Sequence, residues 1–180
     1  MPEVLIPLAT GYEEVEAVTL IDLLRRADIK VTTASLDTKE VCGLSGLNLI
    51  ADTTLDEVKE YTFDMVVLPG GQPGADNLNA DPRIHEILKR HRTTQWVGAI
   101  CAAPKVLVDA GIVDQLKITA YPGFLDAQNS SIELSTEAIE CDDKVITSRS
   151  PGTAMEFALT IIEKLAGTDK RNTVESDLIK

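Results

Sequence analysis

Short apolar runs alternate with longer amphipathic segments along the whole chain. Five runs rich in Val, Ile and Leu predict strands over residues 4–9, 29–36, 65–68, 96–100 and 117–120. Residues 41–52 contain two glycines and predict a small hairpin at one edge. Two further runs, residues 139–141 and 145–148, are typical either of a hairpin or of two successive strands.

The segments between these runs carry helix signals. Residues 13–27 place their apolar side chains on one broad face, as in a helix packed against a sheet. Three more helices begin at a proline that fits the first helical turn, over residues 82–92, 104–110 and 151–167. The polar tail from residue 168 is predicted to be helical or loosely ordered.

Apolar strands that alternate with helices predict a mostly parallel sheet covered on both faces, in one domain over residues 1–180. Ligands in such folds bind at the carboxyl ends of the strands, where the connecting loops converge. The loops of interest are therefore residues 10–16, 69–74, 101–104 and 148–152.

Composition excludes several classes of function. The 180 residues include 17 Lys and Arg against 29 Asp and Glu, a net charge of −12 that disfavours binding to nucleic acids and to anionic membranes. The three cysteines are widely spaced and show no metal-ligand pattern, so neither a zinc site nor a disulfide framework is expected. No signal peptide or membrane span is recognisable, which predicts a reduced, cytoplasmic setting.

Cys101 is the strongest candidate for chemistry. It follows the predicted strand 96–100 and precedes Ala102, Ala103 and Pro104, which begin a helix, so it occupies a strand-to-helix elbow. A thiol at a helix N-terminus is close to the positive end of the helix dipole, which favours the thiolate. The alternative is a buried structural cysteine, since free Cys is among the most buried residue types.

Other residues give weaker signals. Gly70 and Gly71 end a strand and could offer N–H groups to an anion. Glu13, Glu14 and Glu16 cluster at a helix start, and spacing alone does not select one of them. His85 and His91 fall on the polar side of a helix and are interpreted as surface residues, so a Cys–His pair is not expected.

Four motifs in register resemble the ThiJ/PfpI superfamily over essentially the whole chain, and most closely its DJ-1/YajL-like branch. They are Glu13-Glu14-Val15-Glu16-Ala17-Val18, Val67-Leu68-Pro69-Gly70-Gly71, Ala99-Ile100-Cys101-Ala102-Ala103-Pro104 and Thr147-Ser148-Arg149-Ser150-Pro151-Gly152-Thr153. The resemblance implies a flavodoxin-like, class I glutamine amidotransferase-like three-layer sandwich with a nucleophile elbow, assembled as a homodimer.

The resemblance also assigns roles to individual residues. It implies that Cys101 is the nucleophile, that Glu16 is a protonated acid beside it, and that the N–H groups of Gly70, Gly71 and Ala102 line an anion pocket. Further pocket-lining candidates are Tyr121, Arg26 and Arg149. Two positions depart from human-type members: Tyr121 replaces a histidine and Ser45 replaces an arginine.

The resemblance implies a cysteine-dependent conversion of reactive dicarbonyls such as methylglyoxal to hydroxy acids, without a metal or organic cofactor. The expected activity is that of a glutathione-independent glyoxalase or of a protein deglycase that acts on damaged proteins, with a role in protection against oxidative stress. The alternative is a redox sensor or stress chaperone that works through oxidation of Cys101 and turns over no substrate. A thiamine-pathway role has no support in the residues.

Overall fold

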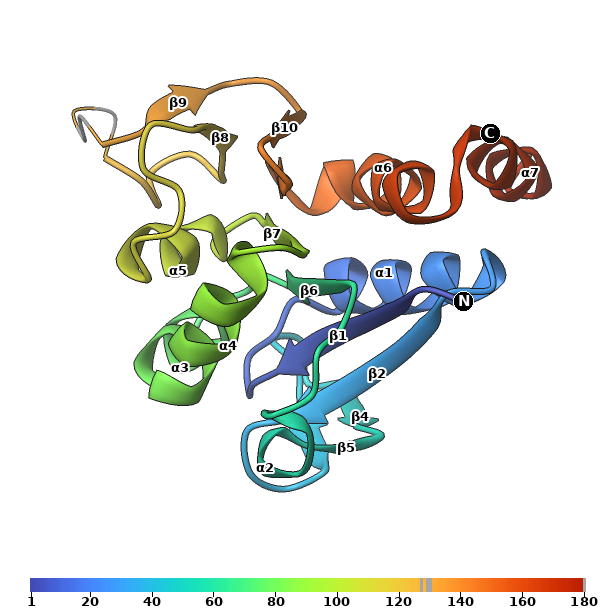
Figure 1. Ribbon diagram of the computed structural model, residues 1–180. Helices are drawn as coiled ribbons and strands as arrows, with labels where there is room; N and C mark the ends of the chain where they lie inside the picture. Colours follow the sequence, from blue (N-terminus) through green and yellow to red (C-terminus); the bar gives the residue numbers. More distant parts are fainter. Residues whose placement is uncertain (127, 129–130, 180) are drawn as a thin grey trace.

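The computed structural model describes residues 1–126, 128 and 131–179. Its main feature is a seven-stranded sheet of order β10-β11-β7-β6-β1-β2-β5 (Figure 1). Every neighbouring pair in it is parallel except β10–β11. The strands are β1 (Glu3–Leu8), β2 (Lys30–Ser35), β5 (Thr53–Thr54), β6 (Met65–Leu68), β7 (Trp96–Ile100), β10 (Ile139–Asp142) and β11 (Val145–Ser148). The predicted mostly parallel sheet is confirmed.

Helices cover both faces of this sheet (Figure 1). One face holds α1 (Glu14–Arg26), α6 (Ala154–Ala166) and α7 (Thr168–Asp177); the other holds α2 (Leu55–Val58), α3 (Gly74–Ala80), α4 (Pro82–Arg92) and α5 (Pro104–Asp109). Side chains of a strand point alternately to opposite faces. Val4, Ile6 and Leu8 of β1 accordingly join the core under α1 and α6, whereas Leu5 joins the core under α3 to α5. The result is the predicted three-layer sandwich.

Two short sheets lie outside the main one. The predicted hairpin forms from β3 (Glu40–Cys42) and β4 (Asn48–Ile50). The predicted strand at residues 117–120 exists as β8 (Lys117–Thr119), but it pairs with β9 (Glu133–Ser135) rather than with the main sheet. β8 reaches the main sheet through a side chain instead, since the N–H of Thr119 donates to Oγ1 of Thr147 at 2.9 Å.

The prediction that both histidines lie on the surface is wrong. His91 is 1% exposed. Its Nε2 accepts a hydrogen bond from the N–H of Phe63 at 3.0 Å, and its Nδ1 lies 2.8 Å from the carbonyl oxygen of Ile87. His85 is half-buried and bonded to Asn79. The buried face of α4 is therefore wider than its aliphatic residues indicate.

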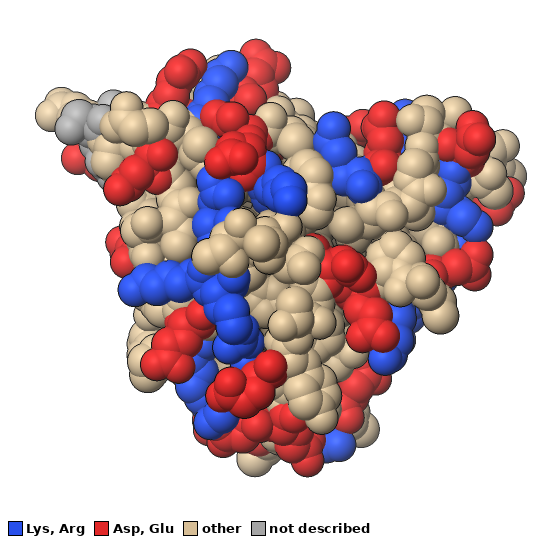
Figure 2. Space-filling view, viewed as in Figure 1, with Lys and Arg blue, Asp and Glu red and all other residues tan. Residues whose placement is uncertain are grey.

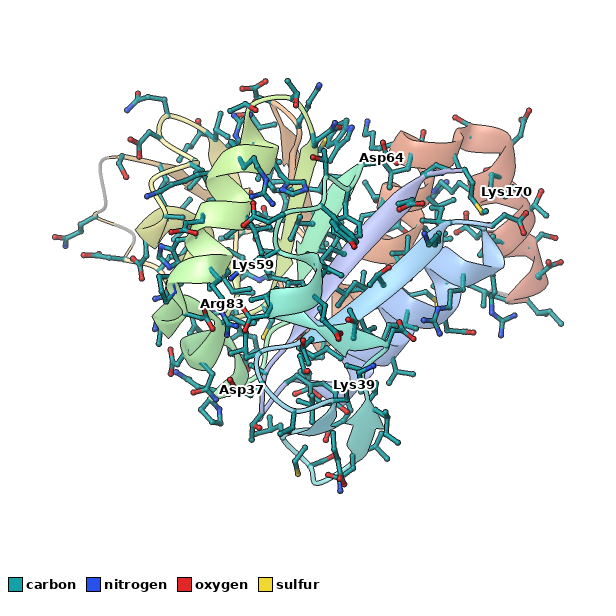
Figure 3. All side chains as sticks on the ribbon, turned by 60° about the horizontal axis from the view of Figure 1, so that its bottom comes forward. Asp37, Lys39, Lys59, Asp64, Arg83 and Lys170 are labelled. Carbon is teal, nitrogen blue, oxygen red and sulfur yellow. The ribbon has the colours of Figure 1, made fainter. Side chains whose placement is uncertain are left out.

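Basic side chains gather over α4, with acidic side chains around them (Figure 2). Arg83, labelled in Figure 3, pairs with Asp56 at 3.1 Å and with Asp81 at 2.5 Å. Arg92 pairs with Asp143 at 2.7 Å. The arginines of this helix are thus balanced by neighbouring acids. Within the described residues, no helix combines the length and the apolar character that a bilayer crossing requires.

The order of the strands reverses between β1 and β6, because the chain passes from β1 to β2 on one side and returns to β6 on the other. The loops that follow β1 and β6 bind each other: the N–H of Glu13 donates to the carbonyl of Gly70 at 2.9 Å, and that of Gly74 donates to the carbonyl of Gly11 at 3.2 Å. Ligands bind at such reversal points in open α/β sheets. Cys101 begins the next loop along the edge.

Candidate active site

Cys101 lies on a sharp turn directly after β7. Its φ of 63° is left-handed, which is uncommon for a residue with a side chain. Its N–H donates to the carbonyl of Ser148 at 2.9 Å, and its carbonyl accepts from the N–H of Tyr121 at 2.8 Å. Strained backbone held by such bonds clusters at functional sites. The predicted elbow is therefore present, and it fixes the position of the sulfur.

Glu16 is the member of the glutamate cluster that faces this cysteine. It lies in the first turn of α1 and is fully buried. The N–H of Gly70 donates to its Oε2 at 2.7 Å, and the Cys101 thiol lies beside the carboxyl. Its buried Oε1 has no hydrogen-bond partner among the described residues. Oε1 is thus the oxygen where a proton is most easily kept.

Burial dominates the ionisation of this pair. It raises the pKa of Glu16 to about 7. Burial, and then the charge of an ionised Glu16, raise the pKa of Cys101 to about 12, while the N–H groups of Ala102 and Gly71 act in the opposite direction. Interacting groups of this kind titrate as a pair. When Glu16 holds the shared proton, the charge that opposes the thiolate is gone and an O–H can face the sulfur.

The expectation that the dipole of the following helix favours the thiolate therefore needs correction. The helix α5 begins only at Pro104 and has six residues, so Cys101 precedes it by three positions. The dipole effect falls off within the first turn of a helix. Stabilisation of a sulfur anion here depends on the protonation of Glu16 and on two N–H groups.

Those two N–H groups belong to Gly71 and Ala102, which were both expected to line the anion pocket. Gly70 was expected to do the same, but its N–H is engaged by Glu16. A side chain at Gly70 would lie 2.7 Å from Oε2 of Glu16 and 2.8 Å from Cβ of Cys101. Gly71 has a φ of 92°, and a Cβ there would lie 2.4 Å from the nitrogen of Glu13. Gly70 therefore permits the close approach of Glu16 and Cys101, and Gly71 permits the close approach of the loop that follows β1.

A pocket of about 260 Å³ opens above Cys101. Its walls are largely apolar, and Tyr121 and Phe124 form an edge-to-face pair in it, with ring centroids 5.9 Å apart. Glu13 is the only Asp, Glu, Lys or Arg among the described residues that line it. The pocket therefore suits a small neutral molecule.

The tip of the β3–β4 hairpin forms one wall of this pocket through Leu44. Oε1 of Glu14 accepts hydrogen bonds from the N–H and the hydroxyl of Ser45, at 2.7 and 2.8 Å, and from the N–H of Leu47 at 3.4 Å. The hydroxyl of Tyr12 donates to the carbonyl of Leu47 at 3.1 Å. The three glutamates thus have three roles, since Glu13 lines the pocket, Glu14 holds the hairpin and Glu16 faces the sulfur.

Of the further pocket-lining candidates, only Tyr121 lies in the Cys101 pocket. Arg26 is exposed in the last turn of α1, where it pairs with Asp22 at 2.9 Å. It follows Glu16 by ten residues, roughly 15 Å along the helix axis, so its placement in the pocket was wrong. Arg149 lines a neighbouring pocket that shares Tyr121 with this one.

Leu44, Phe124 and the pocket role of Glu13 were not predicted from the sequence. A signal for Glu16 is present in the sequence, because Glu16 precedes Leu20 by four residues and Leu23 by seven and so falls on the apolar face of α1. Among the described residues, no group of three or more His, Cys, Asp or Glu is placed to hold a metal ion.

Comparison with known proteins identifies relatives of this chain. The profile of the DJ-1/PfpI family matches residues 2–164. A zebrafish protein, Parkinson disease protein 7 homolog, is 40% identical over 180 residues, which cover 97% of this chain and 95% of that protein. The glutathione-independent glyoxalase DJR-1.2 of Caenorhabditis elegans is 37% identical over 90% of this chain and 87% of its own length.

The similarity extends to structure. The crystal structure of Drosophila melanogaster DJ-1beta superposes with a TM-score of 0.95 at 36% identity, covering 99% of this chain and 97% of that one. Two Arabidopsis proteins, DJ-1 homologs A and B, are each 37% identical, and the chain spans less than half of their length, 46% and 41%.

Proposed function

This chain belongs to the DJ-1/PfpI family, and from that premise we propose that it converts 2-oxoaldehydes such as methylglyoxal and glyoxal to 2-hydroxy acids without glutathione. The observation that carries the proposal is the buried Glu16 carboxyl beside Cys101: a Cβ added at Gly70 would lie 2.7 Å from the one and 2.8 Å from the other, so an acid and a nucleophile are neighbours. A relative named as a glutathione-independent glyoxalase supports it.

The first step is addition of the Cys101 thiolate to the aldehyde carbon of methylglyoxal. A C–S bond forms, and the carbonyl electron pair moves to oxygen. The N–H groups of Gly71 and Ala102 face the sulfur and can stabilise negative charge beside it. The proton on Glu16 passes to the new alkoxide, which leaves a neutral hemithioacetal and a carboxylate.

The second step uses that carboxylate as a base. Glu16 removes the proton from the former aldehyde carbon and returns it to the neighbouring carbon, while the hydroxyl proton of the hemithioacetal passes to the ketone oxygen, so that the ketone becomes an alcohol and the first carbon a carbonyl. The first carbon is oxidised to a thioester while the second is reduced, so the step is an internal redox reaction and uses no external oxidant. Water then cleaves the thioester to release lactate and the thiol.

Product analysis tests the proposal. Wild-type protein incubated with methylglyoxal is expected to yield lactate, and Cys101→Ser is expected to yield none. The exposed thiols Cys42 and Cys141 supply matched controls, because Cys42→Ser and Cys141→Ser should retain turnover. Full lactate formation by Cys101→Ser would refute the proposal.

Protein deglycation would extend the same chemistry to aldehyde adducts on damaged proteins. Removal of such adducts would contribute to protection against oxidative stress. The pocket above Cys101 is small, and one of its lining residues, Tyr121, is 43% exposed to solvent. We therefore expect an adduct to reach Cys101 only when it is carried by a flexible side chain on the surface of the damaged protein. Release of the adduct from a glycated peptide, followed by mass spectrometry, tests this activity separately from lactate formation.

The redox-sensor function remains the alternative, and one contact favours it. A protonated Glu16 beside Cys101 could donate a hydrogen bond to an oxygen of an oxidised Cys101. A gain of two oxygens at Cys101 after mild peroxide, together with negligible methylglyoxal turnover, would select this function over the enzyme.

We also propose that the chain forms a homodimer through α1 and the adjacent hairpin. Val15 and Val18 are 55% and 43% exposed on one face of α1, and Leu44 and Leu47 of the hairpin tip are 50% and 54% exposed. Glu14 ties the hairpin tip to α1, and we propose that these exposed apolar side chains form the contact surface. Sedimentation velocity is expected to show a dimer that Val18→Lys converts to a monomer.

A further inference from the structure

A second pocket, of about 230 Å³, lies on the other side of Tyr121 from Cys101. Tyr121 lines both pockets, so they are neighbours across one side chain. The second pocket is walled mainly by apolar residues, among them Leu125 and Leu134, with Arg149 at its edge. Each pocket alone is below the usual size of a site for a drug-like ligand, so each suits one small group.

Arg149 is fixed next to the reactive cysteine by the backbone. It directly follows Ser148, whose carbonyl accepts the N–H of Cys101 at 2.9 Å, and its own N–H donates to the carbonyl of Ala138 at 3.0 Å. The residue is half-buried and is one of those that line the second pocket. In a chain with 29 acidic residues, its guanidinium forms no ion pair with any residue the structure describes.

The two pockets carry opposite charge. Glu13 is the only Asp, Glu, Lys or Arg among the described residues around the Cys101 pocket, and Arg149 is the only one around the second pocket. A neutral carbonyl group is favoured on one side of Tyr121, and an anion is favoured on the other. A guanidinium that lacks a protein partner is well suited to bind a carboxylate.

We propose that the second pocket is a subsite for a carboxylate, so that the preferred substrates are 2-oxoaldehydes whose short apolar chain ends in a carboxylate. This rests on the proposed function for the reaction at Cys101. A suitable probe is 4,5-dioxopentanoate. Its aldehyde carbon would be oxidised to an acid, its ketone reduced to an alcohol and one water added, which gives 2-hydroxyglutarate with its distal carboxylate unchanged.

Binding can be measured apart from turnover. Calorimetry on Cys101→Ser protein compares 4,5-dioxopentanoate with 2-oxopentanal, an uncharged 2-oxoaldehyde of the same chain length. We expect the anion to bind at least about tenfold more tightly, the size of one charge-assisted hydrogen bond. High salt should reduce this preference. Equal affinities would overturn the proposal.

Variants of two arginines locate the effect. Arg149→Gln in the same background should bring the ratio of the two affinities close to one. Arg26→Gln removes the same charge at a remote exposed site and should leave the ratio unchanged. An equal effect of both variants would overturn the proposal, because it would reflect net charge alone. Preferential binding without conversion of either compound by wild-type protein would instead refute the proposed glyoxalase function and leave the carboxylate subsite standing.

Discussion

Glu16→Gln replaces one oxygen of the buried carboxyl by an amide nitrogen and keeps the shape of the side chain. The N–H of Gly70 retains an oxygen acceptor, and the new amide can donate to the sulfur of Cys101. The amide cannot take up and return a proton. General acid–base catalysis is worth about 10²–10⁴-fold, so lactate formation should fall by that factor.

The same variant should keep the thiol reactive. An ionised Glu16 contributes to the raised pKa of Cys101, and the amide removes that charge. Alkylation of Cys101 by iodoacetamide near neutral pH should therefore be as fast as in the wild type or faster. Glu16→Ala loses the donor as well and should slow both reactions.

The pH dependence of the free energy of unfolding tests the protonation of Glu16 independently of the activity assays. The pKa of Glu16 rises from 4.5 to about 7 on folding, which corresponds to about 3 kcal/mol in favour of the neutral form. The folded protein keeps this proton where the unfolded chain has lost it. The free energy of unfolding of the wild type should therefore fall by about 3 kcal/mol relative to Glu16→Gln between pH 4.5 and 7.

Urea denaturation at several pH values measures that difference, and the lactate and iodoacetamide assays measure the two rates. A parallel pH dependence of stability in both proteins would show that Glu16 is not held neutral by burial. Unchanged lactate formation in Glu16→Gln would show that Tyr121 or water moves the proton, and the role given to Glu16 would be wrong.

Three further predictions concern the scaffold. Gly71→Ala places a Cβ 2.4 Å from the nitrogen of Glu13 at a φ of 92°, so it should destabilise the protein by at least about 1 kcal/mol in urea denaturation and reduce lactate formation; a neutral effect would contradict the reasoning. Glu14→Ala removes the acceptor that holds Ser45, so hydrogen exchange at the N–H of Ser45 should accelerate and KM for methylglyoxal should rise, and wild-type exchange would refute the role of Glu14. His91→Phe leaves a buried N–H without its acceptor and should cost about 1–3 kcal/mol. Burial lowers the pKa of His91, so its contribution should be present above pH 6.5 and lost as the pH falls, and a variant with wild-type stability and acid sensitivity would contradict this.

Periodicity in the sequence was enough to predict the layers of this fold. Residues 82–92 and 96–100 were predicted with the bounds of α4 and β7, because each has a clear start signal and a continuous buried face. The elements α2, α3 and β5 were missed, since they have four, seven and two residues. Such short elements depend on tertiary contacts more than on local pattern.

The candidate site also has a part that local sequence predicts and a part that depends on distant contacts. Strand–cysteine–small-residue order was enough to predict the elbow at Cys101, whereas Glu16 was selected from its neighbours only by resemblance. His91 was misplaced because its partner, the N–H of Phe63, lies 28 residues away. The pocket walls could not be predicted either, because they also depend on contacts between distant parts of the chain. Leu44 is brought to Cys101 by bonds between Glu14 and a hairpin 31 residues further along.

The way the β3–β4 hairpin is attached separates the selection of substrates from the chemistry at Cys101. The β3–β4 hairpin is not part of the main sheet, and its tip is held to α1 by Glu14 and Tyr12. Cys101 and Glu16 are positioned by the sheet and by α1 itself. Leu44 can therefore be replaced without displacing Cys101 or Glu16. Natural selection or directed evolution can change which compounds enter the pocket while the positions of these two residues stay the same.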